Sequence, residues 1–590
     1  MNVLYFFLLL AIHPYISMWW KIFPKAGRKQ WEALIPLYNY CIASKIGGQP
    51  WWWGFFMIIP GAHIVMWAVF NVSLFRRFGF FSLSDTFLGI FFPWYLSYKI
   101  ASDDKIEVGP SSTDWSNEKL VKKRTPGDHL VLFLALPVVG HVVAYVLGGL
   151  SKKKKNKKTY IKEWGDAILF ALIAASAIRT YVFEPFQIPT GSMEKTLLVG
   201  DFLFVNKLAY GSRVPETPIS FPLVHNTIPW LNIRSYSNLE KSNYTRLPGF
   251  TNVQRNDVVV FNFPSGDTAV FDPRVPNGLM GHDYHGILID EALYYAGQNN
   301  DSANFEKKYD YYLNYAKKMM QETKMVYCRD GGTSHYGLIY RPVDKRENYI
   351  KRCVAIPGDK VEVINSVLYI NGKKAFQAEN LNLGYFVGNF PRISQQNLID
   401  RYDLYPQEDY YADGDGNIAF MFLTRGLKKQ LERSYPGVVF QIRTEPKNTD
   451  TTWRGRIQNL HVFPKDFNYN YSMSNFGPIT CPKKGQTIQL TKENIPLYRR
   501  IIGAYERHEL SERKDGIYID GKKASSYTFA MNYYWMMGDN RDNSADSRVW
   551  GFVPEDHIVG RAALVWFSID KHFGMFSGGI RWDRVLKGIK

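Results

Sequence analysis

The stretch NYIKRCVAIPGDKVEV, residues 348–363, is the clearest indication of fold class in this chain. Its first half, Tyr349–Ile356, is a short run rich in β-branched and aromatic residues that ends at turn residues, as strands do. The run VVVFNF at 258–263 has the same character. We therefore expect residues 184–590 to form a mainly β domain.

Two tight hairpins are predicted in this domain. Val367–Ile370 runs into Asn371-Gly372, and Ile517–Ile519 runs into Asp520-Gly521. Both dipeptides favour the two-residue turns of hairpins. The surrounding stretches read VLYINGKKA and GIYIDGKKA, an echo that indicates either paired hairpin units or shared turn chemistry, and we favour the second interpretation.

Two polar, tyrosine-rich stretches, about 268–345 and 377–512, separate the strand-like segments. We interpret both as α/β insertions, since Ala303–Gln321 has a helical composition. Three roles are open to them: capping the domain, contacting a translocation partner, or restricting substrates.

Lys351 lies inside the first strand-like run, among apolar neighbours. Strand alternation favours a solvent-facing side chain, which is the common outcome for a lysine. A buried, neutral lysine would instead be able to act as a general base. Neutrality at pH 7 costs roughly 4 kcal/mol against the ordinary lysine pKa, an amount that burial is able to supply.

The block FEPFQIPTGSMEKTLLVGD, residues 183–201, contains a candidate nucleophile. Ser192 follows Gly191, which lets backbone approach a substrate closely, while Pro185 and Pro189 keep the segment extended. Taken alone, this block predicts only a loop. A serine hydroxyl is a weak nucleophile and needs an adjacent base such as a neutral lysine.

The segment GDNRDNSADSR, residues 538–548, is dense in carboxylates, amides and arginines. A solvated acidic turn is one interpretation and a calcium loop another, but the EF-hand spacing and its terminal glutamate are absent. Interleaved Asp and Arg side chains readily form bidentate pairs. We therefore expect a hydrogen-bonded structural cluster.

Together, these three blocks closely resemble the type I signal peptidases (leader peptidases), a family of serine proteases with a Ser/Lys dyad. The resemblance covers, discontinuously, residues 164–267, 346–376 and 513–570, and GDNRDNSADSR is its most specific part. It implies a mainly β catalytic domain on the outer face of a membrane and a dyad without histidine.

Carried over by position, the resemblance implies that Ser192 is the nucleophile and Lys351 the general base. It also implies an oxyanion hole formed by the Ser192 backbone N–H and Thr190, and a lysine oriented by Ser544. The charged residues expected to support the site are Arg352, Asp539, Asp546 and Arg548. The residues expected to line small pockets for an Ala-X-Ala substrate are Phe186, Ile188, Met193, Leu197, Tyr349 and Ile350.

The sequence departs from the family pattern directly after the nucleophile. The usual S-M-x-P-T-L reads here Ser192-Met193-Glu194-Lys195-Thr196-Leu197, which changes the expected substrate surface but leaves the dyad intact. The membrane region before residue 160 is larger than the family's usual one or two spans, and the two insertions are additional.

Long uncharged runs in residues 1–183 predict a multi-span α-helical membrane region. The candidate spans are Asn2–Trp20, Trp51–Leu74, Phe78–Tyr98, His129–Leu150 and Trp164–Phe183. Of these, Phe78–Tyr98 contains Asp85, and Trp164–Phe183 has Asp166 and Arg179 near its ends. Their exact number stays open, because the basic residues between them give conflicting orientations.

The lysine-rich run Lys152–Lys158 precedes the last candidate span and is expected to stay in the cytoplasm, which places the chain after Phe183 on the outer face. We accordingly divide the chain into a multi-span region (1–150), a cytoplasmic loop with the last span (151–183) and an extracytoplasmic peptidase domain (184–590).

The net charge of +18 is not accompanied by a recognition helix, a zinc module or an aromatic–basic RNA motif, so no nucleic-acid partner is predicted. The four cysteines, Cys41, Cys328, Cys353 and Cys481, lack C-x-x-C spacing, and Cys353 is expected to be a free buried thiol. No metal site and no cofactor are predicted, since no phosphate-binding loop is present.

The sequence thus predicts a serine endopeptidase of the cell (inner) membrane that removes signal peptides from exported preproteins through an acyl-enzyme. Its expected partners are signal peptides and the lipid bilayer, with the protein-export machinery as a further candidate. Two alternatives remain: a Ser/Lys protease with a narrow substrate, and a catalytically silent scaffold of the same fold. The intact Ser192, Lys351 and Ser544 argue against the silent scaffold.

Overall fold

The computed structural model describes residues 16–58, 62–109, 171 and 174–589, apart from residues 219, 222, 229–232, 240, 265, 267, 271–283, 328–332, 336 and 574–577. The chain divides into two units. The first comprises Met1–Val182, Val214–Ile228 and Ile233–Thr245, and the second comprises Phe183–Arg213, Pro229–Asn232 and Arg246–Lys590.

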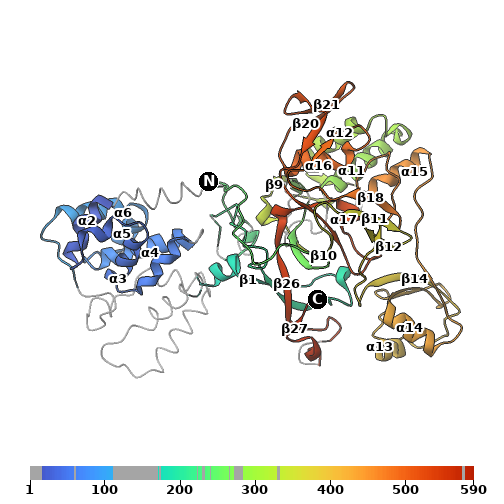
Figure 1. The fold of residues 1–590 in the computed structure, drawn as a ribbon, viewed down its shortest axis with the longest axis horizontal. Coiled ribbons are helices and arrows are strands. Elements are labelled where there is room, and N and C mark those ends of the chain that lie inside the picture. Colours follow the sequence, from blue (N-terminus) through green and yellow to red (C-terminus); the bar gives the residue numbers. More distant parts are fainter. Residues whose placement is uncertain are drawn as a thin grey trace. The chain divides into compact units, whose positions relative to one another are not determined.

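The first unit is mainly helical (Figure 1, blue). Its helices are α2 (Ile16–Lys25), α3 (Tyr38–Ile46), α4 (Ala62–Arg76), α5 (Leu83–Phe91) and α6 (Pro93–Ser102), with the 3-10 helices η1 (Gln30–Ala33) and η2 (Trp51–Ile58) between them. Buried aromatic residues, among them Trp19, Phe23, Tyr40 and Phe70, form a common core. Residues 174–181 are also helical, and β3 (Thr227–Ile228) pairs with β4 (Ile233–Arg234).

Within the described part of the first unit, no helix combines the length and the apolar character that a membrane crossing requires. The candidate span Trp51–Leu74 is divided between η2 and α4, and the candidate Phe78–Tyr98 is divided between α5 and α6. The candidate His129–Leu150, and most of Asn2–Trp20 and Trp164–Phe183, lie outside the described residues.

The division between α5 and α6 has a local cause. Ser82 and Asp85 form a capping box that begins α5, with Ser82 Oγ accepting from the Asp85 backbone N–H. Pro93 opens α6, because its ring removes the N–H that a continuous helix would need at that position. The candidate span Phe78–Tyr98 therefore contains two short helices, α5 and the start of α6, separated at Pro93.

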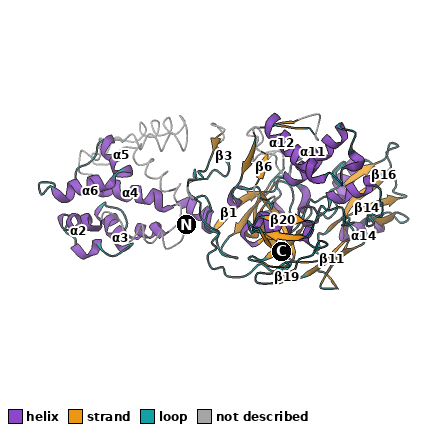
Figure 2. Cartoon of the chain, turned by 90° about the horizontal axis from the view of Figure 1, so that it is seen from above, coloured by secondary structure: helices purple, strands orange, loops and turns teal. Residues whose placement is uncertain are grey.

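The second unit is built on a large antiparallel sheet (Figure 2, orange strands). Its strands follow the order β1 (Phe183–Gln187), β2 (Asp201–Asn206), β26 (Ile558–Ser568), β5 (Val258–Asn262), β10 (Asn348–Ala355), β24 (Tyr533–Met537) and β25 (Val553–Pro554), and β27 (Lys587–Gly588) pairs with β26. The mainly β fold expected for this part of the chain is confirmed.

Both faces of this sheet are covered. Val259 and Phe261 of β5 belong to one apolar cluster, whereas Val258 and Val260 belong to another. In antiparallel register, Lys351 lies opposite Val259, and Ile350 lies opposite Val260. The side chains of β10 therefore face an apolar cluster on both sides of the sheet, and alternation along the strand does not expose Lys351 to solvent.

A second sheet has the order β13 (Lys373–Lys374), β12 (Val367–Ile370), β11 (Lys360–Ile364) and β18 (Phe476–Thr480), and a third has the order β20 (Leu510–Arg513), β21 (Gly516–Ile519) and β22 (Lys522–Lys523). The two predicted hairpins are present as β12–β13 and β21–β22. Asn371 and Asp520 both have positive φ, at 53° and 49°, as such turns require. The two hairpins lie in different sheets, which agrees with shared turn chemistry rather than a paired unit.

The stretch 268–345 contains two packed helices, α11 (Tyr284–Gln298) and α12 (Tyr309–Thr323), so the predicted helix is present. The short strands β6 (Thr268–Val270) and β9 (Leu338–Tyr340) pair beside them, as do β7 (Met325–Val326) and β8 (Thr333–Ser334).

The stretch 377–512 contains a separate small sheet with the order β15 (Tyr410–Ala412), β16 (Ile418–Thr424), β14 (Asn382–Gly388) and β17 (Val439–Ile442). With α13 (Gln395–Tyr402) and α14 (Arg425–Ser434), the chain order is βαββαβ, a split βαβ arrangement. We call residues 382–442 the insertion module.

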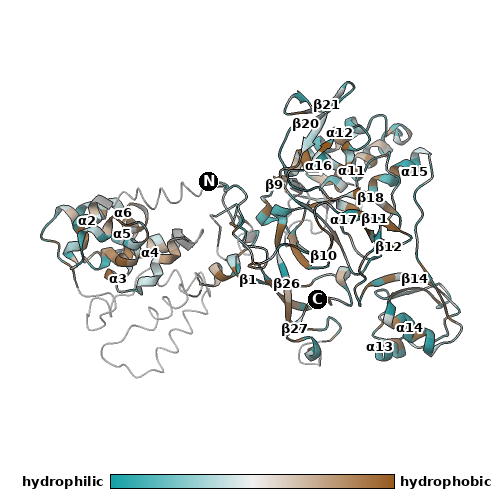
Figure 3. Ribbon diagram, viewed as in Figure 1, coloured by the Kyte–Doolittle hydropathy of each residue, from teal (hydrophilic) through white to brown (hydrophobic). Residues whose placement is uncertain are grey.

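The remainder of that stretch belongs to the body of the second unit. β18 joins the second sheet, and β19 (Thr487–Gln489) pairs with β23 (Ser526–Thr528). The short helices here are α15 (Trp453–Gln458) and α16 (Ile495–Arg500), and α17 (Ser547–Trp550) follows later in the chain. Figure 3 colours β14 largely brown, for hydrophobic residues, and α14 largely teal.

Candidate active site

Ser192 and Lys351 meet in the second unit, although 159 residues separate them in the sequence. Lys351 lies in the middle of β10 and is only 3% exposed. Ser192 lies in a single 3-10 turn, η3 (Gly191–Met193), between β1 and β2. Lys351 Nζ and Ser192 Oγ are 2.5 Å apart and share a hydrogen bond.

The burial of Lys351 changes its proton affinity. Removal from water disfavours the ammonium and lowers the pKa of Lys351 to about 8, while the nearby carboxylates of Asp546 and Asp539 act in the opposite direction. The amine also lies 5.7 Å from the centre of the Tyr349 ring. A serine hydroxyl in contact with such an amine can lose its proton to it near neutral pH.

The turn that carries Ser192 is held by the segment 538–548. The Asn540 backbone N–H donates to the Ser192 carbonyl at 3.2 Å, and Asn540 Nδ2 donates to the Gly191 carbonyl at 3.0 Å. Thr196 Oγ1 donates to Asp539 Oδ2 at 2.7 Å. Met193, which is fully buried, packs beneath the turn. These contacts fix the position of the turn that carries Ser192 against the segment 538–548.

Two buried ion pairs support this arrangement. The Arg352 guanidinium donates to Asp539 from Nε at 2.9 Å and from Nη2 at 2.7 Å, and that of Arg548 donates to Asp546 at 2.9 and 2.8 Å. Burial raises the pKa of Asp546, but the Arg548 guanidinium and backbone donors outweigh that effect and hold it below its usual range. The expected hydrogen-bonded cluster of Asp and Arg side chains is therefore confirmed.

Ser544 lies beside the dyad without bonding to the lysine in this structure. Its hydroxyl donates to the Ala545 carbonyl at 3.4 Å, and no hydrogen bond joins it to Lys351 among the described residues. Gly538 makes the close packing possible, because a Cβ there would collide with Ser544 Oγ and come within 2.6 Å of the Ser192 carbonyl oxygen. A glycine at 538 thus lets Ser544 approach the nucleophile segment.

Thr190 immediately precedes the turn, in extended backbone with φ −134° and ψ 153°, and its side chain is exposed. Of the six residues expected to line pockets, five lie together: Ile188, Met193 and Leu197 are buried in one cluster, with Phe186 and Ile350 packed against it. The sixth, Tyr349, belongs to the cluster on the opposite face of the sheet, where it stacks on Phe263 at 4.7 Å between ring centres.

Lys195, which stands where the family pattern has proline, connects the Ser192 segment to the insertion module. Lys195 Nζ donates to the Asp403 carbonyl at 3.0 Å and lies 3.8 Å from Asp409 Oδ1. Burial raises the pKa of Glu194 to about 7, opposed by the charge of Lys195.

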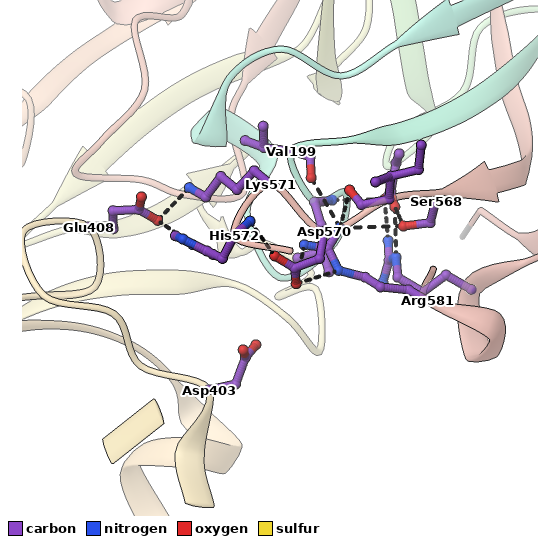
Figure 4. Close-up of polar contacts among 12 residues, drawn as sticks. Val199, Asp403, Glu408, Ser568, Asp570, Lys571, His572 and Arg581 are labelled. Atoms are coloured by element: carbon purple, nitrogen blue, oxygen red, sulfur yellow. Dashed lines mark hydrogen bonds and ion pairs between the residues drawn. The ribbon is translucent and has the colours of Figure 1, made fainter. Parts of the chain in front are cut away.

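The end of the nucleophile segment is fixed by the C-terminal part of the chain. Arg584 donates to Asp201 through Nε at 3.0 Å and Nη2 at 2.5 Å, and its Nη2 also donates to the Thr196 carbonyl at 3.0 Å. Arg581 donates to the Val199 carbonyl at 3.0 Å and pairs with Asp570 (Figure 4).

Sequence reasoning did not single out Asn540, Thr196, Asp201 or Arg584. Asn540 lies within GDNRDNSADSR, next to the predicted site residue Asp539. Its neutral side chain did not indicate that Asn540 would donate hydrogen bonds to the carbonyls of Gly191 and Ser192. Asp201 ends the first block, and a buried acid there required an arginine that only the fold brings close.

No group of three or more His, Cys, Asp or Glu side chains in the described part of the chain is arranged to hold a metal ion. Cys41, Cys353 and Cys481 are free and buried, as expected for Cys353, while Cys328 lies outside the described residues.

A serine that contacts a buried amine of lowered pKa, in a turn fixed by hydrogen bonds, defines the class of serine-type hydrolases. The family model described as "Signal peptidase, peptidase S26" matches residues 161–383 and 484–567, more than half of the chain. The chain therefore belongs to this family and is a serine-type peptidase. A second model, a family of unknown function named DUF5684, matches residues 31–107.

Curated relatives named "Signal peptidase I" agree with this family. The protein of Buchnera aphidicola (subsp. Acyrthosiphon pisum) is 24% identical over 74% of this chain and 83% of its own length, and that of Haemophilus influenzae is 24% identical over 75% and 80%. The Pseudomonas aeruginosa protein is 33% identical over 25% of this chain and 42% of its own length. The family model leaves out residues 384–483, which include nearly all of the insertion module.

Proposed function

We propose that this chain is a membrane-bound signal peptidase that removes signal peptides from exported preproteins with Ser192 as nucleophile and Lys351 as general base. The observation that carries this proposal is the 2.5 Å contact between Ser192 Oγ and the buried Lys351 amine. The lowered pKa of Lys351, about 8, leaves a substantial neutral fraction near pH 7–8 to accept the serine proton.

In the proposed mechanism, the Ser192 oxygen attacks the carbonyl carbon before the scissile bond while its proton passes to Lys351. The tetrahedral oxyanion accepts hydrogen bonds from the Ser192 backbone N–H and the Thr190 hydroxyl. Its collapse breaks the C–N bond, the leaving amine takes the proton from Lys351, and an ester to Ser192 remains. Lys351 then takes a proton from water, which hydrolyses the ester.

The other residues have positioning roles in this proposal. Asn540 holds the carbonyl of Ser192, and the pairs Arg352–Asp539 and Arg548–Asp546 hold the segment that carries Asn540. Ser544, whose side chain lies against Gly538 close to the Ser192 carbonyl, is assigned the role of orienting Lys351 once substrate is bound.

The proposed substrate carries Ala-X-Ala before the cut. Ile188, Met193 and Leu197 are buried under the segment that substrate would cross, and Phe186 and Ile350 border them. Shallow apolar pockets of this kind accept methyl groups and exclude larger side chains sterically.

The proposed membrane location is supported by an aromatic surface, Phe183, Phe202, Phe204 and Trp566, on β1, β2 and β26. The Phe204 and Trp566 rings stack at 5.6 Å, and Phe183 and Trp566 are 43% and 36% exposed. Exposed aromatic residues favour the interfacial region of a bilayer. We propose that this surface faces the outer leaflet, with the peptidase domain outside the cell membrane.

The test is cleavage of a preprotein bearing Ala-X-Ala by the purified full chain in detergent, with the cut located by mass spectrometry. Ser192→Ala and Lys351→Ala are each expected to lose essentially all activity. Ser526→Ala and Lys360→Ala are the matched controls, because both side chains are exposed and lie in strands outside the site.

Cleavage after Ala-X-Ala by the parent chain and both controls, lost in both dyad variants, would support the proposal. Near-normal activity in either dyad variant would overturn the assignment of the dyad. A well-folded but inert parent chain would favour a silent scaffold, and cleavage of only one preprotein among many would favour a narrow-substrate protease.

A further inference from the structure

The insertion module has one covered and one uncovered face. The helices α13 and α14 cover one face of its sheet, where Leu398 and Leu431 pack on Tyr385, Met421 and Leu423. Figure 1 shows both helices beside β14, in yellow and orange. Because side chains alternate along a strand, the neighbours of these residues in β14 and β16 point to the other face.

That other face carries a continuous set of aromatic rings. Phe420 lies 5.6 Å from Phe386, 5.0 Å from Phe422 and 6.2 Å from Tyr411, measured between ring centres. Phe386 is 52% exposed and Tyr411 is 46% exposed, and Val439 on the adjacent strand is 57% exposed. We call these five residues the aromatic face. Phe422 is only 5% exposed, so Phe386, Tyr411 and Val439 supply the exposed part of the aromatic face. Exposed contiguous apolar surface is characteristic of binding sites.

The aromatic face begins where the module meets the catalytic segment. The Asn382 backbone N–H donates to the Asp539 carbonyl at 2.9 Å, and the Arg541 N–H donates to the Asn382 carbonyl at 3.0 Å. Two residues further along β14, the Gly384 N–H donates to Asp542 Oδ2 at 2.7 Å. Since Asn540 holds the Ser192 carbonyl, one four-residue segment contacts both the nucleophile turn and β14.

Gly384 is required for this junction. A Cβ at this position would lie 2.6 Å from the Phe420 ring and 3.2 Å from Asp542. The absence of a side chain therefore lets Phe420 pack over the strand and Asp542 reach its backbone. The junction joins the aromatic face directly to the segment that supports Ser192.

A second attachment, on the loop between α13 and β15, fixes the module on the other side. Asp403 and Asp409 contact Lys195, three residues after the nucleophile. Glu408 pairs with Lys571 (Figure 4). The Tyr405 ring stacks on His572 with 3.9 Å between ring centres. Two separate attachments hold the aromatic face in place before substrate arrives, which reduces the entropy lost on binding.

We propose that the aromatic face binds the part of the substrate polypeptide that follows the scissile bond, taking up apolar side chains of an extended segment. This proposal rests on the proposed function. The module is attached through residues 539–542, which hold the Ser192 turn, and through Lys195, three residues after Ser192, so the aromatic face is continuous with the segment that presents Ser192. A substrate chain that crosses Ser192 extends away from it in two directions. The expected Ala-X-Ala pockets on β1, β10 and the turn take the part before the cut, which leaves the part after the cut for the aromatic face.

The charges near the face favour polypeptide over nucleic acid. Arg443, which lies over the Phe420 ring at 5.9 Å, is paired with Glu445 at 2.5 Å. Binding of a nucleic acid without sequence preference depends on unpaired basic residues along the phosphates as well as on stacking rings. The cation over the Phe420 ring is thus already paired with a carboxylate.

The test compares two substrates with the same Ala-X-Ala site. The long one continues for about 20 residues after the cut, enough to span a small domain when extended, with Phe and Leu spaced along it. The short one ends a few residues after the cut. The variant Phe386→Ser/Tyr411→Ser removes the two most exposed rings, and Tyr311→Ser on α12, whose ring is 60% exposed, is the control.

We expect the double variant to reduce kcat/KM for the long substrate roughly tenfold, mainly through KM, while cleaving the short substrate like the parent chain. The control should cleave both substrates normally. The single variants Phe386→Ser and Tyr411→Ser, together with thermal melts, separate the loss of binding from misfolding.

Unchanged cleavage of the long substrate by the double variant would overturn the proposal. A difference that persists when the chain is shortened after the cut, and disappears when it is shortened before the cut, would overturn the choice of side. Binding of a labelled oligonucleotide that the double variant loses would assign the face to nucleic acid instead. Failure of the parent chain to cleave either substrate would count against the proposed function and is distinct from these outcomes.

Discussion

Lys351 experiences three influences on its charge: burial, which favours the neutral amine, and the carboxylates of Asp546 and Asp539, which favour the ammonium. Each carboxylate is paired with an arginine, so its field at the lysine is partly compensated. Burial outweighs both carboxylates, and the result is an amine that changes charge in the physiological range rather than near its ordinary pKa.

At the residue scale, we predict that kcat/KM for a soluble peptide rises with pH through about 8 and then levels off. The neutral form of Lys351, the form able to accept a proton, dominates only above its pKa of about 8. Glu194, whose pKa burial raises to about 7, is the competing group. The pH–rate profile of Glu194→Gln should keep the same rise, and a profile that loses it would assign the ionisation to Glu194.

Residue identity alone did not predict the burial of Lys351. Local alternation indicated a solvent-facing side chain, whereas the segments that lie against Lys351, the β5 strand at Val259 and the turn at Ser192, are far from it in the sequence. The resemblance in three motifs did bring Ser192 and Lys351 together. It did not indicate that the Ser544 hydroxyl contacts Ala545, since a rotatable side chain has several partners within reach.

At the element scale, the link between the nucleophile turn and the insertion module is testable through Lys195. We predict that Lys195→Met increases hydrogen exchange in residues 403–409 and lowers the free energy of unfolding by about 1 kcal/mol, because Asp403 and Asp409 lose a partly buried cation. The control Lys428→Met removes a comparable lysine that pairs with Glu432 within α14. Equal exchange in both variants would mean that Lys195 does not hold the module.

Tight hairpins were predictable from sequence, whereas the insertion module was not. The dipeptides Asn371-Gly372 and Asp520-Gly521 determine their turn geometry locally, because their residues tolerate positive φ. The central strands of the module, β14 and β16, are separated in the sequence by α13 and the edge strand β15. The register between two such strands depends on how they pack and not on their local composition. The tyrosine-rich composition of 377–512 therefore gave no element boundaries.

For the whole molecule, the aromatic surface on β1, β2 and β26 predicts a difference between soluble and membrane-bound substrates. We predict that Trp566→Ser cleaves a soluble peptide in detergent normally but cleaves a preprotein anchored in vesicles several-fold more slowly, since an interfacial ring is lost. Trp453→Ser on α15 is the matched control, with 38% exposure against 36% for Trp566. Normal cleavage of the vesicle-bound preprotein by Trp566→Ser would contradict the proposed membrane-facing surface.

The division into a helical N-terminal part and a mainly β part was predictable from hydropathy and strand patterns. The lengths of the helices were less predictable, because the hydropathy of a run does not show where a helix is interrupted. In the candidate span Phe78–Tyr98, the Ser82–Asp85 cap sets the start of α5, and Pro93 separates α5 from α6. Hydropathy averaged over a window does not register a single missing N–H.

The attachment of Arg584 to Asp201 and Thr196 has a consequence for biosynthesis. A nascent chain displays Ser192 early and Lys351 somewhat later, but the arginine that anchors the nucleophile segment leaves the ribosome almost 400 residues after it. The late arrival of Arg584 would keep the serine poorly positioned until synthesis is nearly finished, and thereby protect the growing chain from self-cleavage.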